Sequence, residues 1–482
     1  MFENRSACRS TLLASLLTPL LFACASGPNP STSTRPQLTA AEAARYSYAE
    51  VLKTTGTAGA MTTDPWDPLA DACMSAGKCG TDYTVDKAAK ASGTVLNTIQ
   101  AAVNKAVIDA TAAKRTSRIY IRVMPGTYNE LVYVPALAAP ITLYSTEADA
   151  SKTRIAANID AGMPGDEFTA KFGAQFKDVD PSIAAMAKVQ LDKGKSSIGT
   201  SGSAMVWIKN DGFQAKNITF EDTYNEDRGC KEKANDKGQC PTGNHQAVAF
   251  LIDAADKVQV ENGRFISNQD TLYFKSSAVG KTNRSFYNNS YVEGDVDFIF
   301  GRATAFFRNT EIKSLGGRSA SVFATAPSTN YGTPYGIVFD NCDFTSDGLG
   351  VATTADTYLG RQWFESQRCS PYGDAKAACV IDAANTGTES ATLIRKSTVE
   401  TVGKVVVMNS RIGKHINKSA WSDWESSSAK SNFRKATYSS DTFFDNLQAA
   451  GKDPAALGYK KKTPAEPFLA EFNNTGAGAS PK

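Results

Sequence analysis

The sequence predicts an all-β fold, a right-handed, single-stranded parallel β-helix with a short N-terminal helical cap. The first observation behind this prediction is a repeat in which an asparagine is followed three residues later by Phe, Val or Ile. It occurs at Asn217, Asn262, Asn289, Asn309, Asn341 and Asn409. The first five copies follow one another at intervals of 20 to 45 residues, as short strands joined by loops of variable length do in a solenoid.

The second observation is the run of strand-like segments and turn residues that begins after Ser117. Residues 118–134 and 141–145 are rich in β-favouring side chains and are interrupted by turn residues. Asparagine suits the tight bends between faces because it tolerates left-handed backbone geometry. Parallel crossovers are almost always right-handed, which sets the expected sense of the coil. A β-sandwich is the structural alternative that this pattern leaves open.

Length and charge set the outer limits. A chain of 482 residues with a repeat architecture can form one long domain, so we expect a single catalytic domain over residues 39–482, including a C-terminal extension, and a monomer. The formal net charge of +3 gives no electrostatic case for nucleic acid. It is compatible with a polyanionic substrate without requiring one.

The first residues are typical of an export signal rather than of the fold. Arg5 and Arg9 precede an apolar run that is too short to cross a membrane, and the run ends at Cys24. We therefore predict a lipoprotein signal peptide over residues 1–23, a lipid anchor at Cys24 and a flexible tether over residues 24–38. The protein would then be an outer-membrane lipoprotein. Simple cleavage, giving a periplasmic or secreted protein, is the alternative.

The cysteines agree with an oxidising compartment. Six of them form close sequence pairs: Cys73 with Cys79, Cys230 with Cys240, and Cys369 with Cys379. Cys342 is left over in a strand-like segment and is expected to be a buried free thiol. A zinc site is the competing interpretation, but the chain has no CxxC pair and only two histidines.

Two segments are expected to be helical. Thr39 can cap a helix that continues to about Leu52. Residues 97–114 place Ile99 and Val103 at helical spacing, and this helix is expected to pack against one end of the main body.

The segment Gly294-Asp-Val-Asp-Phe-Ile-Phe-Gly301 places two acids in an apolar, β-favouring run. If it is a strand, Asp295 and Asp297 project on the same face. A carboxylate in such surroundings is costly unless it is paired or used. A calcium or turn site and a structural ion pair are the alternatives that the segment itself leaves open.

A β-helix brings residues about one coil apart onto neighbouring rungs. Gln269 follows Gln246 by 23 residues, and Asp297 follows Asp270 by 27. Rungs lie roughly 4.8 Å apart, so these four side chains can form one polar patch. Two carboxylates at that distance cannot both ionise freely, which favours one protonated acid and one nucleophile or base. The glutamine amides can donate to a developing oxyanion.

Five segments, in this order, resemble the signature segments of the pectin methylesterase family. They are Gly126-Thr-Tyr-Asn-Glu130, Gln246-Ala-Val-Ala-Phe250, Gln269-Asp-Thr-Leu272, Gly294-Asp-Val-Asp-Phe-Ile-Phe-Gly301 and Leu359-Gly-Arg-Gln-Trp363. The likeness spans roughly residues 90 to 430 and is closest to a bacterial lipoprotein branch. That branch also includes proteins assigned as acyl-CoA thioester hydrolases.

The resemblance implies a pectin-lyase-like β-helix that hydrolyses galacturonate methyl esters without metal or cofactor. Asp297 would attack the ester carbonyl, and Asp270 would protonate the leaving methanol and then activate water. Gln246 and Gln269 would hold the oxyanion, and Arg361 would keep Asp297 ionised and oriented. The substrate, methyl-esterified pectin or an oligogalacturonide, would contact Trp363, Phe300, Met205, Gln246 and Arg361.

The sequence departs from the family at two places. Gln362 stands where a proline is usual, which suggests a more flexible loop around Arg361, and Met205 stands where a hydroxyl residue is common. Asp295 is expected to be a bend or solvent residue.

Two further functions are carried as alternatives: a thioesterase with the same two aspartates, and a catalytically idle β-helix that binds saccharide. A serine hydrolase is disfavoured because no GxSxG segment occurs. Lyase or glycosidase chemistry fits the amide pair less well.

Overall fold

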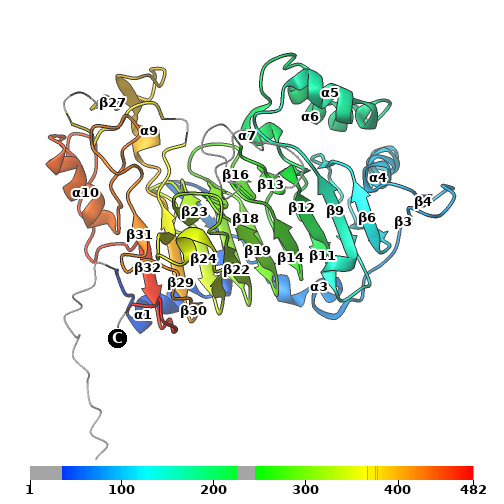
Figure 1. The fold of residues 1–482 in the computed structure, drawn as a ribbon, viewed down its shortest axis with the longest axis horizontal. Helices are drawn as coiled ribbons and strands as arrows, with labels where there is room; N and C mark the ends of the chain where they lie inside the picture. Colours follow the sequence, from blue (N-terminus) through cyan, green and yellow to red (C-terminus); the bar gives the residue numbers. More distant parts are fainter. Residues whose placement is uncertain (1–34, 225–244, 366, 375, 377, 481–482) are drawn as a thin grey trace, which may run out of the picture.

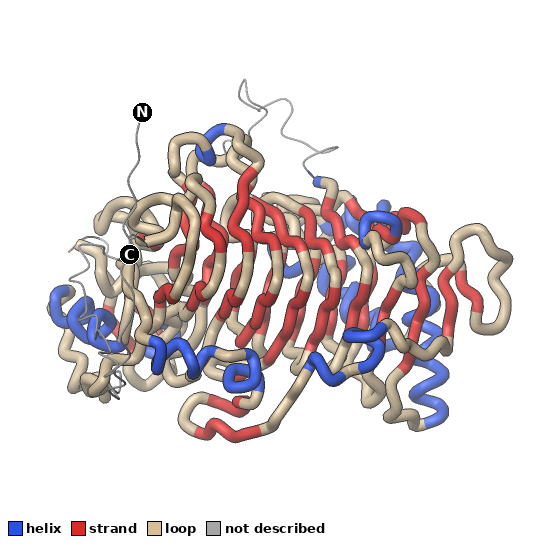
Figure 2. The backbone as a smooth tube through the Cα atoms, turned by 90° about the horizontal axis from the view of Figure 1, so that it is seen from below, coloured by secondary structure: helices blue, strands red, loops and turns tan. Residues whose placement is uncertain are grey.

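The computed structural model describes residues 35–224, 245–365, 367–374, 376 and 378–480. Its body is a right-handed parallel β-helix, as the sequence predicts, in which strands stack side by side along the long axis (Figure 2). Three sheets run the length of the body. Each coil contributes one strand to each sheet, so residues far apart in the sequence become neighbours on adjacent rungs.

The first sheet carries the site discussed below. Its strands, in spatial order, are β7 (Val132–Val134), β10 (Val206–Ile208), β13 (Phe250–Asp253), β16 (Leu272–Lys275), β20 (Ile299–Gly301), β23 (Val322–Pro327), β26 (Thr357–Arg361) and β31 (Trp421–Ser422). All neighbouring pairs in this sheet are parallel.

The second sheet is the longest. Its strands are β4 (Val95–Leu96), β3 (Tyr83–Val85), β5 (Ile119–Val123), β8 (Ile141–Tyr144), β11 (Gln214–Lys216), β14 (Val258–Glu261), β18 (Arg284–Asn288), β21 (Thr304–Arg308), β24 (Ile337–Asp340), β29 (Val405–Met408) and β32 (Leu469–Phe472). The third sheet contains β6 (Gly126–Asn129), β9 (Thr153–Ala157), β12 (Thr219–Asp222), β15 (Arg264–Ile266), β19 (Tyr291–Gly294), β22 (Glu311–Ser314), β25 (Asp343–Ser346) and β30 (Arg411–Ile412).

Stacked apolar side chains fill the interior of the coil. Phe307 lies between Tyr287 and Phe339, with ring centroids 4.5 and 4.9 Å away. Such columns arise because equivalent positions of successive rungs point into the same core. They hold the rungs in register and thereby fix the relative positions of side chains on the outer faces.

The repeated asparagines mark the turn between the second and third sheets. All six have positive φ, between 50° and 57°, as their predicted role in tight bends requires. Their side chains take part in an asparagine ladder: Asn262 donates to Asn217 at 2.9 Å, and Asn341 donates to Asn309 at 2.7 Å. Asn309 in turn donates to Asn288, the neighbour of the repeated Asn289, at 3.1 Å. The prediction of a repeat is therefore confirmed, and the side-chain ladder gives it a physical basis.

The N-terminal helical segment is broken into three short pieces, α1 (Ala40–Ala43), a 3-10 turn (Ala44–Tyr46) and α2 (Tyr48–Leu52). Thr39 caps it as predicted, within a capping box completed by Glu42. The segment packs on the outer face of the second sheet, where Val51 and Leu52 join the cluster around Phe286 and Phe306. It covers a side of the β-helix rather than its end.

The end of the β-helix is covered by α4 (Ile99–Ala113), close to the predicted bounds (Figure 1). Thr98 caps this helix, and Val103 and Val107 are buried against the core as expected.

The other helices lie on the periphery. They are α3 (Ala72–Ala76), α5 (Gly165–Phe172), α6 (Pro181–Leu191), α7 (Gly199–Gly202), α9 (Lys396–Val399) and α10 (Ser440–Ala449). A hairpin of β1 (Thr54–Thr57) and β2 (Ala60–Thr63) pairs with β17 (Lys281–Thr282), and β27 (Val380–Asp382) pairs with β28 (Leu393–Arg395). In the described part of the chain, no helix combines the length and the apolar character that crossing a membrane needs.

The predicted tether extends too far. Residues 35–38 belong to the fold, because the Leu38 amide donates to the Glu471 carbonyl at 2.8 Å and the Glu471 amide donates to Pro36 at 2.9 Å. Arg35 and Glu471 form a buried, doubly hydrogen-bonded ion pair, with both distances 2.6 Å. The start of the fold is thus fastened to its last rung. The predicted signal peptide and Cys24 lie outside the described residues.

Two predicted disulfides are present, Cys73–Cys79 and Cys369–Cys379. Cys342 is a buried free thiol, as predicted. The third predicted pair, Cys230 and Cys240, lies outside the described residues. The two disulfides are consistent with an oxidising compartment.

Candidate active site

A cleft of about 210 Å³ lies on the outer face of the first sheet. It contains the whole polar patch predicted from the rung spacing. Its lining residues are Thr200, Gln246, Gln269, Asp270, Tyr273, Asp297, Phe300, Ala326, Arg361, Trp363 and Trp424. They come from successive coils, so the parallel stacking of the strands brings them together.

The two acids occupy equivalent places on neighbouring rungs. Leu272 pairs with Ile299, and Asp270 and Asp297 each lie two residues before that pair. Asp270 has φ of +66° and Asp297 has φ of +54°, so each sits in a tight turn that aims its side chain outward from the strand that follows. The Asp270 amide donates to the Val296 carbonyl at 3.1 Å, which joins the two turns directly.

The acidic segment is not one continuous strand. β19 ends at Gly294, residues 295–297 form a bend, and β20 begins at Ile299. Strand alternation does not apply within this bend, so the prediction that Asp295 and Asp297 share a face is wrong.

Asp295 does lie in a bend, but it is not in solvent. It is fully buried and makes a doubly hydrogen-bonded ion pair with Arg318, at 2.5 and 2.7 Å. The backbone turn sends Asp295 and Asp297 to two different arginines.

Asp297 is paired with Arg361, the last residue of β26. Nε of Arg361 donates to one carboxylate oxygen at 2.9 Å, and Nη2 donates to the other at 2.7 Å. The guanidinium carbon lies 4.0 Å from the ring centroid of Phe323 and 3.9 Å from that of Trp424. Two aromatic faces and a bidentate carboxylate thus fix the arginine, and the two charge-assisted hydrogen bonds fix the Asp297 carboxylate in turn.

The surroundings of Asp270 favour its protonated form. Burial raises its pKa well above the ordinary range of an aspartate, and the negative charge of Asp297 raises it further, while Arg361 opposes the increase. Burial disfavours a charged carboxylate, and a neighbouring carboxylate does so too. The pair therefore offers a carboxyl group that holds its proton strongly next to a carboxylate bound to an arginine.

The two glutamines are anchored by their backbones beside this pair. The Gln246 carbonyl accepts from the Ala161 amide at 2.8 Å, and the Gln269 carbonyl accepts from the Ala247 amide at 3.0 Å. Both side chains line the cleft. Within the described residues, the buried Oε1 of Gln246 has no hydrogen-bond donor.

Aromatic side chains form the wall of the cleft. Phe300 stacks on Tyr273, with ring centroids 4.1 Å apart, and Trp363 contacts Phe300 at 5.8 Å. Phe300 and Trp363 thus lie where the sequence placed them. The Tyr273 hydroxyl donates to Glu365 at 3.2 Å.

Two expectations about the surrounding residues were wrong. Met205 is fully buried in the core and lines no part of the cleft, so its side chain has no surface to offer a substrate. Gln362 does not loosen the Arg361 loop. Its buried amide donates to the carbonyls of Gly403 and Thr437, at 3.0 and 2.8 Å, and accepts from the Thr437 amide at 2.5 Å. These contacts fasten the loop to the C-terminal region.

Sequence reasoning missed Tyr273 and Trp424, which line the cleft together with the unpredicted Thr200 and Ala326. It also missed Arg318, which lies outside the cleft as the partner of Asp295. The signal for Tyr273 was available, because it pairs with Phe300 in the register that relates Asp270 to Asp297. Trp424 and Arg318 lie in loops whose lengths the repeat does not determine.

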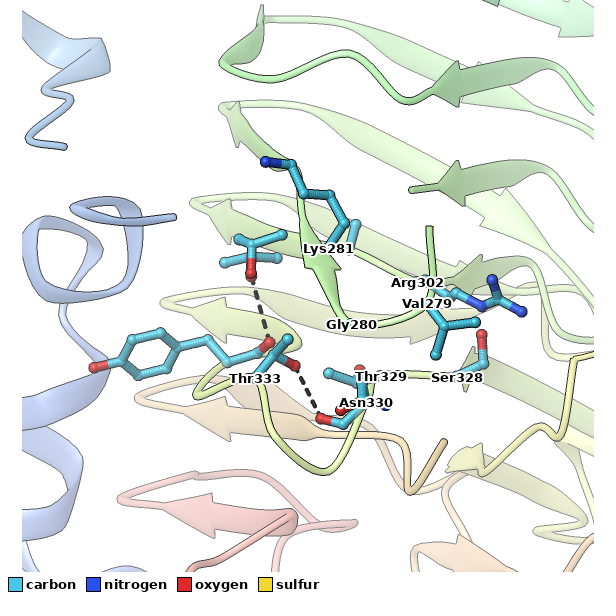
Figure 3. A pocket seen from close by; sticks show the side chains of 12 residues that line it. Val279, Gly280, Lys281, Arg302, Ser328, Thr329, Asn330 and Thr333 are labelled. Atoms are coloured by element: carbon cyan, nitrogen blue, oxygen red, sulfur yellow. Dashed lines mark hydrogen bonds between the residues drawn. The ribbon is translucent and has the colours of Figure 1, made fainter. Parts of the chain in front are cut away.

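A second pocket, beside β17, differs in kind (Figure 3). Lys281, Arg302 and Asn330 are among the residues that line it, and its described lining contains neither Asp nor Glu. Its volume of about 10 Å³ is room for about one water molecule. It cannot perform the two-carboxylate chemistry that the cleft supports.

Comparison with known proteins agrees with the geometry. Residues 182–370 match the family model described as Pectinesterase. A pectinesterase of Ralstonia solanacearum is 33% identical over 471 residues, covering 95% of both chains. YbhC of Escherichia coli (strain K12), provisionally named an acyl-CoA thioester hydrolase, is 34% identical over 333 residues, covering 67% of this chain and 71% of its own.

Two solved structures share the fold over nearly the full length. The rice weevil pectin methyl esterase has a TM-score of 0.65 at 27% identity, covering 94% of this chain and 100% of its own. The Escherichia coli YbhC structure has a TM-score of 0.66 at 26% identity, covering 97% and 100%. The chain therefore belongs to the pectinesterase family of carboxylic ester hydrolases.

Proposed function

We propose that this protein removes methyl groups from esterified galacturonate units of pectin or its oligomers, and that Asp297 and Asp270 perform the chemistry. The observation that carries the proposal is the divided pair: Asp297 is bound to Arg361, while burial raises the pKa of Asp270 well above its usual range. This pair can supply a nucleophile and a general acid side by side.

The reaction has two steps. A carboxylate oxygen of Asp297 attacks the ester carbonyl, and the bond to the methoxy oxygen breaks as Asp270 gives that oxygen its proton. Methanol leaves, and an acyl group remains on Asp297. Asp270, now ionised, takes a proton from water as the water attacks the acyl carbon. The products are galacturonic acid, which loses its proton to the solvent, and the original carboxylate of Asp297, with the proton back on Asp270.

In this mechanism the amides of Gln246 and Gln269 stabilise the negative charge that develops on the carbonyl oxygen. Both line the cleft beside the two acids. Amide donors fixed by the scaffold before reaction need no reorganisation as the charge forms.

The surroundings of the cleft favour a sugar. Trp363 and Trp424 offer aromatic faces of the kind on which sugar rings pack. A larger groove of about 650 Å³ adjoins the cleft through Arg361. Its lining is mostly polar: Ser319, Ser321, Ser419, Ser422, Ser426, Asp423 and Glu425, with Ala320, Val296, Phe323, Tyr358 and Trp421. Hydroxyl and carboxylate groups suit a hydrated polysaccharide better than an acyl chain.

Thioester hydrolysis is the second candidate because of the similarity to YbhC. Asp297 could attack a thioester carbonyl in the same way, with Asp270 as the acid and base. The polar groove beside Arg361 argues against this substrate, since an acyl chain would require an apolar channel.

The predicted lipid anchor at Cys24 belongs to this proposal as well. It would hold the enzyme on the periplasmic or outer surface of a membrane, in the oxidising environment with which the two disulfides agree. Globomycin sensitivity of processing, together with radiolabelled palmitate incorporation into wild type but not into Cys24→Ser, would test the anchor.

The decisive experiment compares methanol release from methylated oligogalacturonides with hydrolysis of palmitoyl-CoA. Wild type should release methanol, and Asp297→Ala should not. Asp192→Ala, which removes an exposed carboxylate just after the end of α6, is the matched control and should retain wild-type activity. Methanol release that persists in Asp297→Ala would refute the mechanism. Hydrolysis of the thioester alone would establish the second candidate, and saccharide binding without either activity would indicate a binding protein.

A further inference from the structure

We propose that Asp295 and Arg318 form a positioning pair, which fixes the turn that carries Asp297 and balances the charge beside Asp270. This inference rests on the function proposed above. Neither residue lines the cleft, and neither takes part in the two reaction steps. Asp295 lies in the turn before Asp297 and Arg318 binds its carboxylate, so their role in the reaction is indirect.

The ion pair of Asp295 and Arg318 is buried and bidentate. Asp295 is fully buried, and the Arg318 side chain is 13% exposed. The two hydrogen bonds, Nε to Oδ2 at 2.5 Å and Nη2 to Oδ1 at 2.7 Å, use both carboxylate oxygens. Burying an ion pair carries a large desolvation cost, so such a pair is weak evidence for stability alone. A role in fixing one local geometry accounts for it better.

Asp295 fastens the turn to both neighbouring rungs. Its amide donates to the Asn268 carbonyl at 2.9 Å on one side, and its carbonyl accepts from the Phe323 amide at 3.0 Å on the other. Its carboxylate also accepts from the Val296 amide at 2.6 Å. The Val296 carbonyl, in turn, accepts from the Asp270 amide. The two peptide groups that flank Val296 therefore connect the Asp295 carboxylate to the backbone of Asp270.

The turn needs this support. Asp297 has φ of +54°, and a backbone in this region persists only where its surroundings hold it. Arg361 holds the Asp297 carboxylate, but the backbone just before it is held by Asp295. Removing the pair should allow the turn to move, and small displacements of a reacting group are costly in rate.

The charges of Asp295 and Arg318 also act on the pKa of Asp270. Four charged groups act on Asp270: Asp297, Arg361, Asp295 and Arg318. Asp295 raises the pKa of Asp270, and Arg318 lowers it, so the intact pair contributes opposing effects. Removing one member should expose the effect of the other.

The two variants should therefore shift the alkaline limb of the pH profile in opposite directions. Asp270 must be protonated to donate to methanol, so activity is lost as pH rises through its pKa. In Asp295→Asn the unbalanced Arg318 lowers that pKa, and the alkaline limb of kcat/KM should move to lower pH. In Arg318→Gln the unbalanced Asp295 raises it, and the limb should move to higher pH. In both, kcat should fall by roughly 10- to 100-fold while KM changes little.

Arg318→Lys separates position from charge. It keeps the positive charge but cannot make the bidentate contact. The alkaline limb should therefore stay near its wild-type position while kcat still falls.

The matched control is Asp256→Asn. Asp256 pairs with the fully buried Arg284 on the second sheet, at 2.6 Å. This variant should lose stability without moving the pH profile. Thermal melts and circular dichroism establish that each variant is folded, and if Asp295→Asn does not fold, Arg318→Gln carries the test.

Unshifted limbs in Asp295→Asn and Arg318→Gln, or the same shift in Asp256→Asn, would overturn the inference. That result is distinguishable from failure of the proposed function. If Asp297→Ala is inactive and the limbs do not move, only the positioning pair is refuted. If Asp297→Ala remains active, the mechanism itself fails.

Discussion

Two aspartates with the same side chain acquire different properties at this site. Asp297 meets a guanidinium clamped between Phe323 and Trp424, whereas Asp270 lies in a buried position that penalises its charge. The difference comes from the neighbours that each rung supplies. Different neighbours therefore allow one type of side chain to serve as the nucleophile at one position and as the acid at the other.

Asp270 should reduce the stability of the protein at neutral pH. A carboxyl group whose pKa is raised by folding binds its proton more tightly in the native state, so the free energy of unfolding falls as pH rises above the unfolded value of about 3.9. Asp270→Asn removes this penalty. We expect it to be inactive but to melt at a higher temperature than wild type at pH 7.

The gain should vanish below about pH 4, where the carboxyl is protonated in both states. Scanning calorimetry from pH 3 to 8 checks this. A melting temperature for Asp270→Asn that lies below wild type throughout would contradict it.

The glutamines should act on the rate of the chemical step. Gln246→Ala and Gln269→Ala should each lower kcat by about 10²- to 10³-fold, as loss of an oxyanion donor does. Steady-state kinetics of methanol release is the measurement. Gln448→Ala, on the exposed surface of α10, is the control. An effect on KM alone would show that the amides bind substrate without stabilising the oxyanion.

At the scale of elements, the turn between the second and third sheets is the unit that repeats. Sequence could predict it because asparagine is both frequent there and conformationally suited to the bend. Sequence could not predict the break of the 40–52 helix into three pieces, since the packing of Val51 and Leu52 on Phe286 decides its path. Tertiary packing overrides local helical preference in such a segment.

The same limit applies at the site. Asp270 and Asp297 were predictable because the coil length relates their positions. Arg318 was not, because it lies in a loop between β22 and β23 that the repeat does not constrain. The contacts of Gln362 come from Gly403 and Thr437, far along the chain. No local sequence pattern could indicate that Gln362, at the usual position of a proline, would fasten the Arg361 loop through its side-chain amide.

The asparagine ladder should be measurable as stability. Asn309 combines a positive φ with hydrogen bonds to Asn288 and Asn341. Asn309→Ala loses both features and should cost about 2–3 kcal/mol in the free energy of unfolding, from left-handed strain and lost hydrogen bonds.

Asn309→Gly keeps the backbone geometry at little cost and should lose only the ladder contribution, about 1 kcal/mol. Urea denaturation of both variants separates the two terms. Equal losses in the two variants would show that backbone strain contributes nothing.

At the scale of the whole molecule, the two ends of the fold are joined. Arg35 reaches Glu471 in the last rung, and its Nη1 donates to the Gly478 carbonyl at 2.8 Å. Arg35→Met would leave a buried carboxylate without its partner. Breaking such a pair typically costs about 3–5 kcal/mol, so the midpoint of denaturation should fall markedly.

Specific activity of the folded Arg35→Met enzyme should not change, because neither Arg35 nor Glu471 lines the cleft. Lys188→Met, in the exposed pair with Asp192, is the control and should cost little, since surface pairs contribute about 0–1 kcal/mol. Equal effects of the two variants would contradict the role assigned to Arg35.

The joined ends also determine how an anchored molecule would stand. The chain enters the fold at Arg35, beside the last rung, and Arg35 lies 11 residues after the predicted lipid site at Cys24. An extended chain covers at most about 3.3–3.6 Å per residue, so the leash is no longer than about 40 Å. The C-terminal end of the β-helix would then be the part of the fold that lies nearest to the bilayer. The cleft, several rungs away, would open sideways onto polymer passing over the cell surface.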